Sequence, residues 1–318
     1  MSVPNPTRRA VVALGGNAIT RPGEAGTVAQ DLANLERSLE AVVELLDRGY
    51  ELLLTHGNGP QVGNQMIRVE LTRGKAPHLP LDVMVADLQG GLGYMIERVL
   101  RGKLRRRGLP QGVCCMVAMV EVRADDPALA DPTKYVGPFY GEAEARALAA
   151  EHGWVVKRDA DRGWRRVVPS PDPIAVVESR EVRALLATGT IVISAGGGGI
   201  PVARDAAGDL VGVEGVIDKD LASTVLALAV GATELFILTA VDRVMLDFGT
   251  PRARPVATLP VAEARRHLAA GQFPPGSMGP KIEAACRFLE GGGERVLITH
   301  IDRLPEALAG ETGTWITA

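Results

Sequence analysis

Two acidic residues flank a lysine at Asp218-Lys219-Asp220, directly before an apolar run that predicts a helix from Leu221 to Val230. A helix N-terminus exposes free backbone N–H groups and carries a partial positive charge, so it suits phosphate groups. A lysine at that point adds a full charge, and the two carboxylates could hold its ammonium group or a metal ion. The alternative is a helix-capping aspartate beside a solvated lysine.

Lysine is uncommon in this chain, since only six of its 35 lysine and arginine residues are lysines. The ammonium group is a compact point charge on a slender side chain, whereas guanidinium is wide and planar, so a crowded phosphate pocket can require lysine. Lys134, Lys219 and Lys281 all lie in the motifs described below. Random survival of a few lysines in an arginine-rich chain is the alternative.

Three glycine-rich segments each follow an apolar run typical of a buried parallel strand. They are 15–16 after 10–14, 57–59 after 52–55, and 196–199 after 191–194. Ligands of open parallel sheets bind beyond the carboxyl ends of the strands. Glycine lets backbone N–H groups approach phosphate oxygens without a Cβ in the way. One such turn would be weak evidence, but three at strand ends indicate a phosphate site.

The elements that must position these residues alternate along the chain. Strands are expected at 10–14, 52–55, 113–122, 191–194, 235–239, 296–299 and 314–316, and a hairpin at 202–213. Helices are expected at about 32–46, 60–72, 83–107, 178–187 and 221–230, with another beginning near 276–281. This alternation predicts an α/β fold built on a parallel sheet.

Residues 123–173 interrupt the alternation with several proline-containing turns. Within them we expect a short helix at 142–151, strands at 154–156 and 164–168, and a hairpin turn at 158–163. We interpret the segment as a small insertion that stands off the main sheet and could act as a lid.

Composition excludes several classes of protein. The 318 residues suffice for one large or two ordinary domains, and the formal net charge of −3 argues against a nucleic-acid surface. No apolar run approaches the roughly 20 residues of a membrane helix, and residues 1–9 lack the apolar core of a signal peptide. Three cysteines without a C-x-x-C pair favour buried free thiols in a reducing cytoplasm, so we expect a cytosolic protein.

Familiar catalytic motifs are missing from the sequence. It contains no G-x-x-x-x-G-K-[ST] phosphate loop, no G-x-G-x-x-G after the first strand, no H-E-x-x-H and no G-x-S-x-G. The five histidines form no pair at metal-binding spacing. His56 lies in a glycine loop, where it could be a catalytic base, although a lone histidine there is more often a structural hydrogen-bonding group.

Seven segments, in order, resemble the motifs of carbamate kinases, and the similarity extends from about Val11 to Trp315. They are 11–19 (VVALGGNAI), 56–64 (HGNGPQVGN), 132–134 (PTK), 137–139 (GPF), 196–201 (GGGGIP), 217–220 (IDKD) and 276–281 (GSMGPK). The resemblance implies membership of the amino-acid kinase superfamily, with an α/β/α sandwich around a largely parallel central sheet and a small inserted lid subdomain. It places the phosphoryl acceptor on residues 1–200, lid 123–173 included, and the nucleotide on residues 201–318.

The reaction that this resemblance implies is reversible transfer of a phosphoryl group from carbamoyl phosphate to ADP, which yields ATP and carbamate. Its loose, anionic transition state requires alignment and positive charge more than acid–base catalysis. Lys219 and Lys281 are assigned to the nucleotide-side phosphates and the transferring group, and Lys134 to carbamoyl phosphate from the lid. Asp220 corresponds to the superfamily's lysine-organising aspartate, and Asp218 is a second candidate for that role, a Mg²⁺ contact or a helix cap.

The remaining assignments also follow the resemblance. Predicted acyl-phosphate contacts are Gly15, Gly16, Asn17, Gly57, Asn58 and Gly59, and predicted nucleotide contacts, besides the two lysines, are Gly196, Gly197, Asp242 and Met278. Asn17 could instead be a left-handed turn residue and Asp242 a turn cap. Mg²⁺ is expected to accompany ATP or ADP, held mainly by phosphates and water without a protein metal site. A cytoplasmic homodimer acting in arginine catabolism, by the arginine deiminase pathway, is also implied.

Two features bear on the alternatives. Acetylglutamate-kinase-like members of the superfamily carry a lysine where this chain has Ala13. Carbamate kinases lack that lysine and have one in the lid, and this chain resembles them through Lys134. Tyr135 stands where many relatives have proline. The alternatives are another kinase of this superfamily, acting on a different small carboxylate or a nucleoside monophosphate, and a nucleotide-binding sensor without turnover.

Overall fold

The computed structural model describes residues 8–21, 23–159 and 163–318, and its centre is an eight-stranded sheet. In spatial order the strands are β15 (Thr258–Pro260), β17 (Thr314–Thr317), β16 (Arg295–His300), β12 (Glu234–Thr239), β1 (Arg8–Leu14), β2 (Tyr50–His56), β9 (Ile191–Ile193) and β3 (Val113–Cys115). Neighbouring strands are parallel except β16 and β17. The predicted parallel α/β sheet is thereby confirmed.

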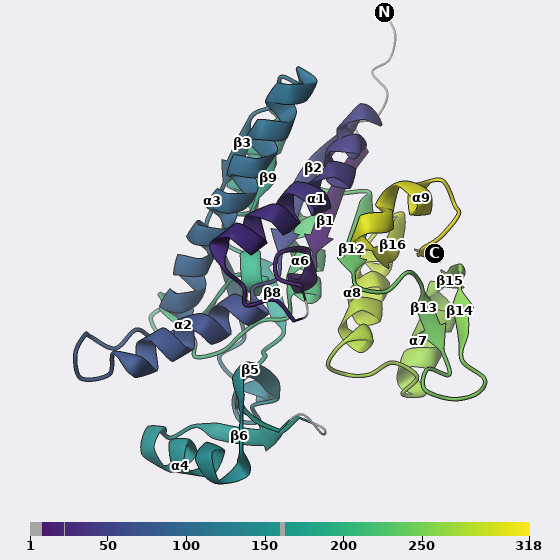
Figure 1. Ribbon diagram of the computed structural model, residues 1–318. Helices are drawn as coiled ribbons and strands as arrows, with labels where there is room; N and C mark the ends of the chain where they lie inside the picture. The colour runs from purple at the N-terminus through teal and green to yellow at the C-terminus, as the bar shows by residue number, and fades with distance from the viewer. Residues whose placement is uncertain (1–7, 22, 160–162) are drawn as a thin grey trace, which may run out of the picture.

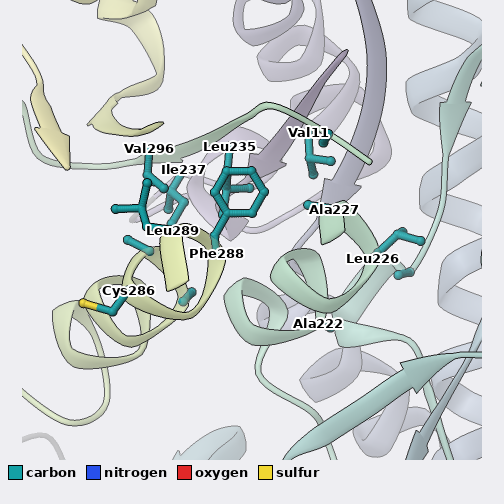
Figure 2. Close-up of a cluster of buried hydrophobic side chains, with 14 of the residues drawn as sticks. Val11, Ala222, Leu226, Ala227, Leu235, Ile237, Cys286, Phe288, Leu289 and Val296 are labelled. Carbon is teal, nitrogen blue, oxygen red and sulfur yellow. The ribbon is translucent and has the colours of Figure 1, made fainter. Parts of the chain in front are cut away.

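Helices cover both faces of this sheet because successive residues of its buried strands point to opposite sides. Val12 packs with α1 (Val28–Asp47), α3 (Leu81–Arg107) and α9 (Leu304–Leu308). Val11 packs on the other face with α5 (Ser179–Leu186), α6 (Lys219–Val230) and α8 (Met278–Glu290). Figure 2 shows part of this second layer, where Phe288 of α8 lies against strand residues such as Ile237. The architecture is the expected α/β/α sandwich.

The expected single strand at 113–122 is wrong, because the chain changes sheets within it. β3 ends at Cys115, and β4 (Met119–Val122) joins a second sheet with the order β11-β10-β4-β8. Its other strands are β10 (Ile200–Arg204), β11 (Leu210–Gly212) and β8 (Pro173–Val176). The Gln89 side chain forms hydrogen bonds with both the backbone N–H and the carbonyl of Ala118. These bonds pair the backbone polar groups where the chain passes from the first sheet to the second. A continuous apolar run does not reveal such a change of partner. The expected hairpin of β10 and β11 is confirmed.

A small subdomain is inserted between β4 and β8. It consists of the antiparallel sheet β5-β7-β6, from β5 (Lys134–Tyr140), β6 (Val155–Arg158) and β7 (Trp164–Val168), together with α4 (Glu142–His152). In Figure 1 it projects away from the central sheet, below α2 (Gly59–Leu71). Residues 160–162 of the predicted turn at 158–163 lie outside the described residues. The predicted helix and strands are present, and β5 adds a strand that its Gly-Pro sequence did not suggest.

Between β12 and α8 the chain also forms the hairpin of β13 (Val244–Leu246) with β14 (Arg254–Val256), and α7 (Val261–Ala269). No helix in the described part of the chain is long and apolar enough to span a lipid bilayer.

Candidate active site

The three glycine-rich segments meet at one end of the central sheet, because β1, β2 and β9 are neighbours. The Gly57 N–H donates to the carbonyl of Leu14 over 2.9 Å, and the Gly15 N–H donates to Leu238 over 2.9 Å. A Cβ at Gly57 would lie 3.1 Å from the backbone nitrogen of Gly16. The first two loops therefore touch, and glycine permits that approach.

The third glycine segment supports the loop at 56–59, which we call the acceptor loop. A Cβ on Gly196 would lie 2.2 Å from His56 Nε2, and one on Gly197 would lie 2.2 Å from Asn58 Nδ2. Gly197 also has a φ of 69°, in the left-handed region that favours glycine. Both glycines are buried under the acceptor loop, so their direct neighbours are its side chains.

Helix α6 begins at Lys219, two residues before the predicted start, because Asp218 caps it. Asp218 Oδ1 accepts a hydrogen bond from the Asp220 N–H over 2.9 Å. Its second oxygen, Oδ2, accepts from Lys134 Nζ over 2.8 Å. Asp218 is therefore both the helix cap and the partner of the lysine on β5 of the inserted subdomain.

Asp220 binds the other two lysines with its two oxygens. Lys219 Nζ lies 2.5 Å from Oδ1, and Lys281 Nζ of α8 lies 2.8 Å from Oδ2. The structure thus brings Lys134, Lys219 and Lys281, which we call the lysine cluster, to the first turn of α6 from three separate elements. Two carboxylates hold three ammonium groups, which leaves a net positive charge for an anionic ligand.

Burial sets the electrostatics of this cluster. Asp220 is only 2% exposed. Burial alone would raise the pKa of its carboxyl group, but the charges and hydrogen bonds of Lys219 and Lys281 outweigh this effect and lower that pKa. Burial would likewise lower the pKa of Lys281, yet its contact with Asp220 raises it. The pKa of Lys219 is lowered by burial and by the neighbouring charge of Lys281, so an added anion would stabilise its charged form.

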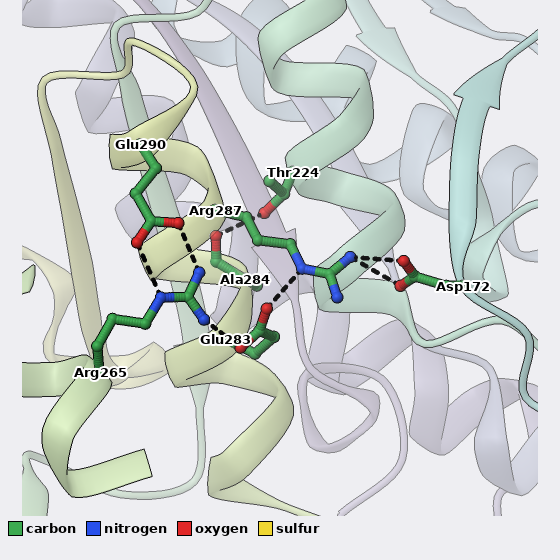
Figure 3. Close-up of polar contacts among 7 residues, drawn as sticks. All are labelled: Asp172, Thr224, Arg265, Glu283, Ala284, Arg287 and Glu290. Atoms are coloured by element: carbon green, nitrogen blue, oxygen red, sulfur yellow. Dashed lines mark hydrogen bonds and ion pairs between the residues drawn. The ribbon is translucent and has the colours of Figure 1, made fainter. Parts of the chain in front are cut away.

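The packing of α6 against α8 sets the distance between Lys219 and Lys281. The Thr224 hydroxyl donates to the carbonyl of Ala284 over 3.0 Å in the buried contact between the two helices. Figure 3 shows this hydrogen bond together with ion pairs that Glu283, Arg287 and Glu290 of α8 form with neighbouring segments and with each other. Arg265 of α7 contacts Glu283 and Glu290 there, and Arg287 contacts Glu283 and Asp172. The helix that carries Lys281 is therefore held from both sides.

A cavity of about 450 Å³ opens beside the lysine cluster. Of the predicted site residues, it is lined by Gly15, Gly16, Asn17, Lys219, Met278 and Lys281. Sequence reasoning missed the rest of its wall, which includes Thr239, Arg243, Met245, Phe248 and Phe273. These residues come from strand ends and turns with no pattern of their own, so only their convergence identifies them. An apolar wall next to two lysines suits a flat ring that carries phosphates.

Several predicted residues lie elsewhere. Gly57, Asn58, Gly59, Gly196 and Gly197 do not line this cavity. Asp242 does not line it either, although its neighbours Val241 and Arg243 do, and its carboxylate pairs with Arg303 over 2.9 Å near the surface. Asn58 is 3% exposed, and its Nδ2 has no hydrogen-bond partner among the described residues.

Among the described residues no group of three histidine, cysteine, aspartate or glutamate side chains could hold a metal ion. The oxygens of Asp218 and Asp220 already accept bonds from lysines or backbone N–H groups.

His56 is buried, and its Nδ1 lies 3.1 Å from the carbonyl of Gly57. Burial lowers its pKa from 6.5 to about 4, with a smaller contribution from the charge of Lys219. The folded protein therefore binds fewer protons than the unfolded chain between these values, so stability falls as the pH falls from 6.5 towards 4. We expect a loss of about 3 kcal/mol in the free energy of unfolding over this range, from about 1.4 kcal/mol per pKa unit.

Denaturant unfolding of His56→Gln, measured from pH 7.5 to pH 4, checks this expectation. The variant should show a flatter pH dependence than the wild type, whatever its stability at pH 7.5. The exposed His78 supplies the matched control, His78→Gln, which should keep the wild-type dependence. An unaltered slope in His56→Gln would contradict the assignment.

Comparisons with known proteins agree with this geometry. The model of the amino acid kinase family matches residues 8–300. Carbamate kinase of Pyrococcus horikoshii is 46% identical over 311 residues, which cover 97% of this chain and 99% of that protein. Carbamate kinase from Giardia lamblia, solved bound to citric acid, is 36% identical, with a TM-score of 0.91 and 98% and 99% of the two chains covered. Its structure bound to AMP-PNP has a TM-score of 0.89 at the same identity and coverage. The chain therefore belongs to the amino acid kinase family of phosphotransferases, among its carbamate kinases.

Proposed function

We propose that this protein catalyses reversible phosphoryl transfer between carbamoyl phosphate and ADP, with ATP and carbamate as products. The observation that carries the proposal is the convergence of the lysine cluster from three elements onto Asp218 and Asp220. Transfer of a phosphoryl group passes through a transition state rich in negative charge, and fixed ammonium groups stabilise it without accepting or donating protons.

The cavity of about 450 Å³ is the proposed nucleotide site. Its apolar wall would contact the base, and Lys219 and Lys281, which also line it, would contact the phosphates. The structure of the Giardia lamblia enzyme with AMP-PNP supports a nucleotide on this scaffold. Most of the lining residues belong to 201–318, which supports that half of the chain as the nucleotide side.

The acceptor side is proposed to lie over the glycine loops. Backbone N–H groups of Gly15, Gly16 and Asn17, with those of Gly57, Asn58 and Gly59, would cradle the acyl phosphate. Gly196 and Gly197 would also act through the acceptor loop that they support, and their contact with the nucleotide stays a prediction. Lys134 would reach carbamoyl phosphate from the inserted subdomain, which we propose is a lid.

Neither direction of this reaction requires a general base, because carbamate is already an anion and ADP is a good nucleophile. The pKa of about 4 that burial gives His56 makes its imidazole a weak base, which supports a structural role for it in the acceptor loop. Mg²⁺, bound mainly through the nucleotide phosphates and water, would neutralise phosphate charge during transfer. Asp218 and Asp220 fit that arrangement, because their carboxylate oxygens already accept hydrogen bonds from lysines or from a backbone N–H group.

The proposal is tested by measuring the formation of ATP from ADP and carbamoyl phosphate with a coupled assay on the purified protein. We expect turnover that depends on Mg²⁺ and exceeds the rate with acetyl phosphate. Preferential turnover of another carboxyl phosphate or of a nucleoside monophosphate would indicate a different kinase of the family. Nucleotide binding without turnover of any of these substrates would indicate a sensor.

The resemblance extends the proposal to a homodimer that works in the cytoplasm, in arginine catabolism by the arginine deiminase pathway. Sedimentation equilibrium would test the dimer, with a mass near 33.6 kDa as the contradicting result.

A further inference from the structure

A pair of buried hydroxyl groups joins the strand that leads into the acceptor loop to the helix that carries Lys219. Thr55 is the next-to-last residue of β2, and Ser223 lies one turn into α6. Both side chains are completely buried, and their oxygens are 2.6 Å apart. Ser223 Oγ also lies 2.6 Å from the carbonyl oxygen of Lys219.

The direction of these bonds follows from the number of hydrogens. A serine hydroxyl has one hydrogen and two lone pairs, and a carbonyl can only accept. Ser223 must therefore donate to the Lys219 carbonyl, which leaves the Thr55 hydroxyl to donate to Ser223. The resulting chain runs from Thr55 through Ser223 to the backbone of Lys219. Among the described residues it is the only hydrogen-bonded link between β2 and α6.

Apolar packing alone would not fix α6 along the sheet. Ala222, Leu226 and Ala227 bury this helix against the sheet, but hydrophobic contact has no preferred direction. Two short hydrogen bonds in a dry interior are directional, and an unpaired hydroxyl there would lower the stability of the fold. The pair therefore sets the register between the first turn of α6 and the residue before His56, where the acceptor loop begins.

We propose that Thr55 and Ser223 are positioning residues that hold Lys219 at the correct distance from the acceptor loop. The inference rests on the proposed function, in which phosphate passes between the two regions that this pair connects. Alignment supplies much of the rate in such a transfer, and a displacement of about 1 Å can cost about 100-fold. Neither hydroxyl contacts the cavity, so their effect reaches the substrates through Lys219 and the acceptor loop.

Four single variants, and the double variant Thr55→Val with Ser223→Ala, separate positioning from simple stabilisation. Thr55→Val keeps the shape and removes the donor, Ser223→Ala breaks both bonds, and Thr55→Ser restores a hydroxyl. The matched control is Tyr50→Phe, which removes a buried hydroxyl at the opposite end of the same strand, where it donates to Glu234 over 2.9 Å. For each variant we would measure kcat, the KM for ADP and for carbamoyl phosphate, and the free energy of unfolding.

We expect Thr55→Val and Ser223→Ala to lower kcat by about 10- to 100-fold, with the KM for ADP within about twofold of the wild type. The double variant should lose little more than Ser223→Ala alone, because both changes break one chain of bonds. Thr55→Ser should recover most of the loss. Tyr50→Phe should lose stability without loss of kcat. A kcat for Thr55→Val no lower than that of Tyr50→Phe would overturn the proposal.

A second measurement does not depend on turnover, so it separates this proposal from the proposed function. Amide hydrogen exchange with Mg²⁺ and ADP present should become faster at 57–59 in Ser223→Ala and at 220–222 in Thr55→Val. Each change is read on the element opposite the substitution, which simple local loosening would not reach. Unchanged exchange at both segments would refute the positioning role. Absence of carbamoyl phosphate turnover in the wild type would instead contradict the proposed function alone.

Discussion

Replacement of Asp220 by asparagine is expected to lower kcat by at least about 100-fold, because the carboxylate holds two lysines of the proposed transfer site in place. Lys219 and Lys281 lie 2.5 Å and 2.8 Å from its two oxygens. An asparagine amide can accept from one ammonium group but turns an N–H₂ group towards the other. The second ammonium then loses its partner and moves away from the position in which it would meet phosphate.

The same variant should also be less stable. Asp220 is 2% exposed, and removal of one partner from a buried charge pair typically costs about 3 to 5 kcal/mol. The pKa of Asp220 is lowered in the folded state, so this contribution is present above the unfolded value of 3.8 and disappears as the pH falls through the folded value. At pH 7 it is therefore fully present and measurable by denaturant unfolding.

The effect of ADP on the stability of Asp220→Asn gives a further test of this role. Excess ADP with Mg²⁺ should restore part of the lost stability, because the ligand's negative charge replaces that of Asp220. The matched control is Asp47→Asn, which breaks an exposed pair with Arg107 and should leave turnover and stability near the wild type. Wild-type kcat in Asp220→Asn would show that the lysine cluster does not require its carboxylate.

Replacement of Lys134 by alanine is expected to reduce kcat by about 100- to 1,000-fold, the range seen when one donor to developing negative charge is removed. The KM for ADP should change by less than about threefold, because Lys134 does not line the cavity proposed for the nucleotide. It reaches Asp218 from β5, and its side chain is 35% exposed, which leaves it free to exchange that partner for a substrate.

Two comparisons sharpen this prediction. Lys157→Ala removes the other lysine of the inserted subdomain, which pairs with the exposed Asp131, and should leave kcat near the wild type. Lys134→Arg keeps the charge but replaces a point charge by a planar fork, so it should restore only part of the rate. Equal losses of turnover and ADP affinity in Lys134→Ala would contradict the assignment of this lysine to carbamoyl phosphate.

Several features of the site could be predicted from local sequence because each depends on one short segment. Apolar runs that end in glycine predicted the ends of β1, β2 and β9. A buried strand requires apolar residues, and a tight turn after it requires glycine, so both leave a mark in the local sequence. The scarcity of lysine drew attention to Lys134, Lys219 and Lys281. An aspartate before an apolar helix identified the cap at Asp218, although α6 began two residues earlier than expected.

Other features depend on which elements pack together, and spacing along the chain does not encode that. Nothing local indicates that Lys281 pairs with Asp220 rather than with a nearer acid, or that the run at 113–122 changes sheets. Spacing also does not reveal that the missing side chain of Gly197 makes room for Asn58, which lies far away in sequence.

The sequence by itself thus determined the class of fold, the glycine loops and the lysines, because backbone conformation and charge type are local requirements. Only the tertiary structure decided which charges meet, which residues line the cavity of about 450 Å³, and that Thr55 contacts Ser223 across 168 positions of sequence. Such contacts arise when the two helical layers close on the sheet, and the directional bonds among their buried polar groups are satisfied only in that one arrangement.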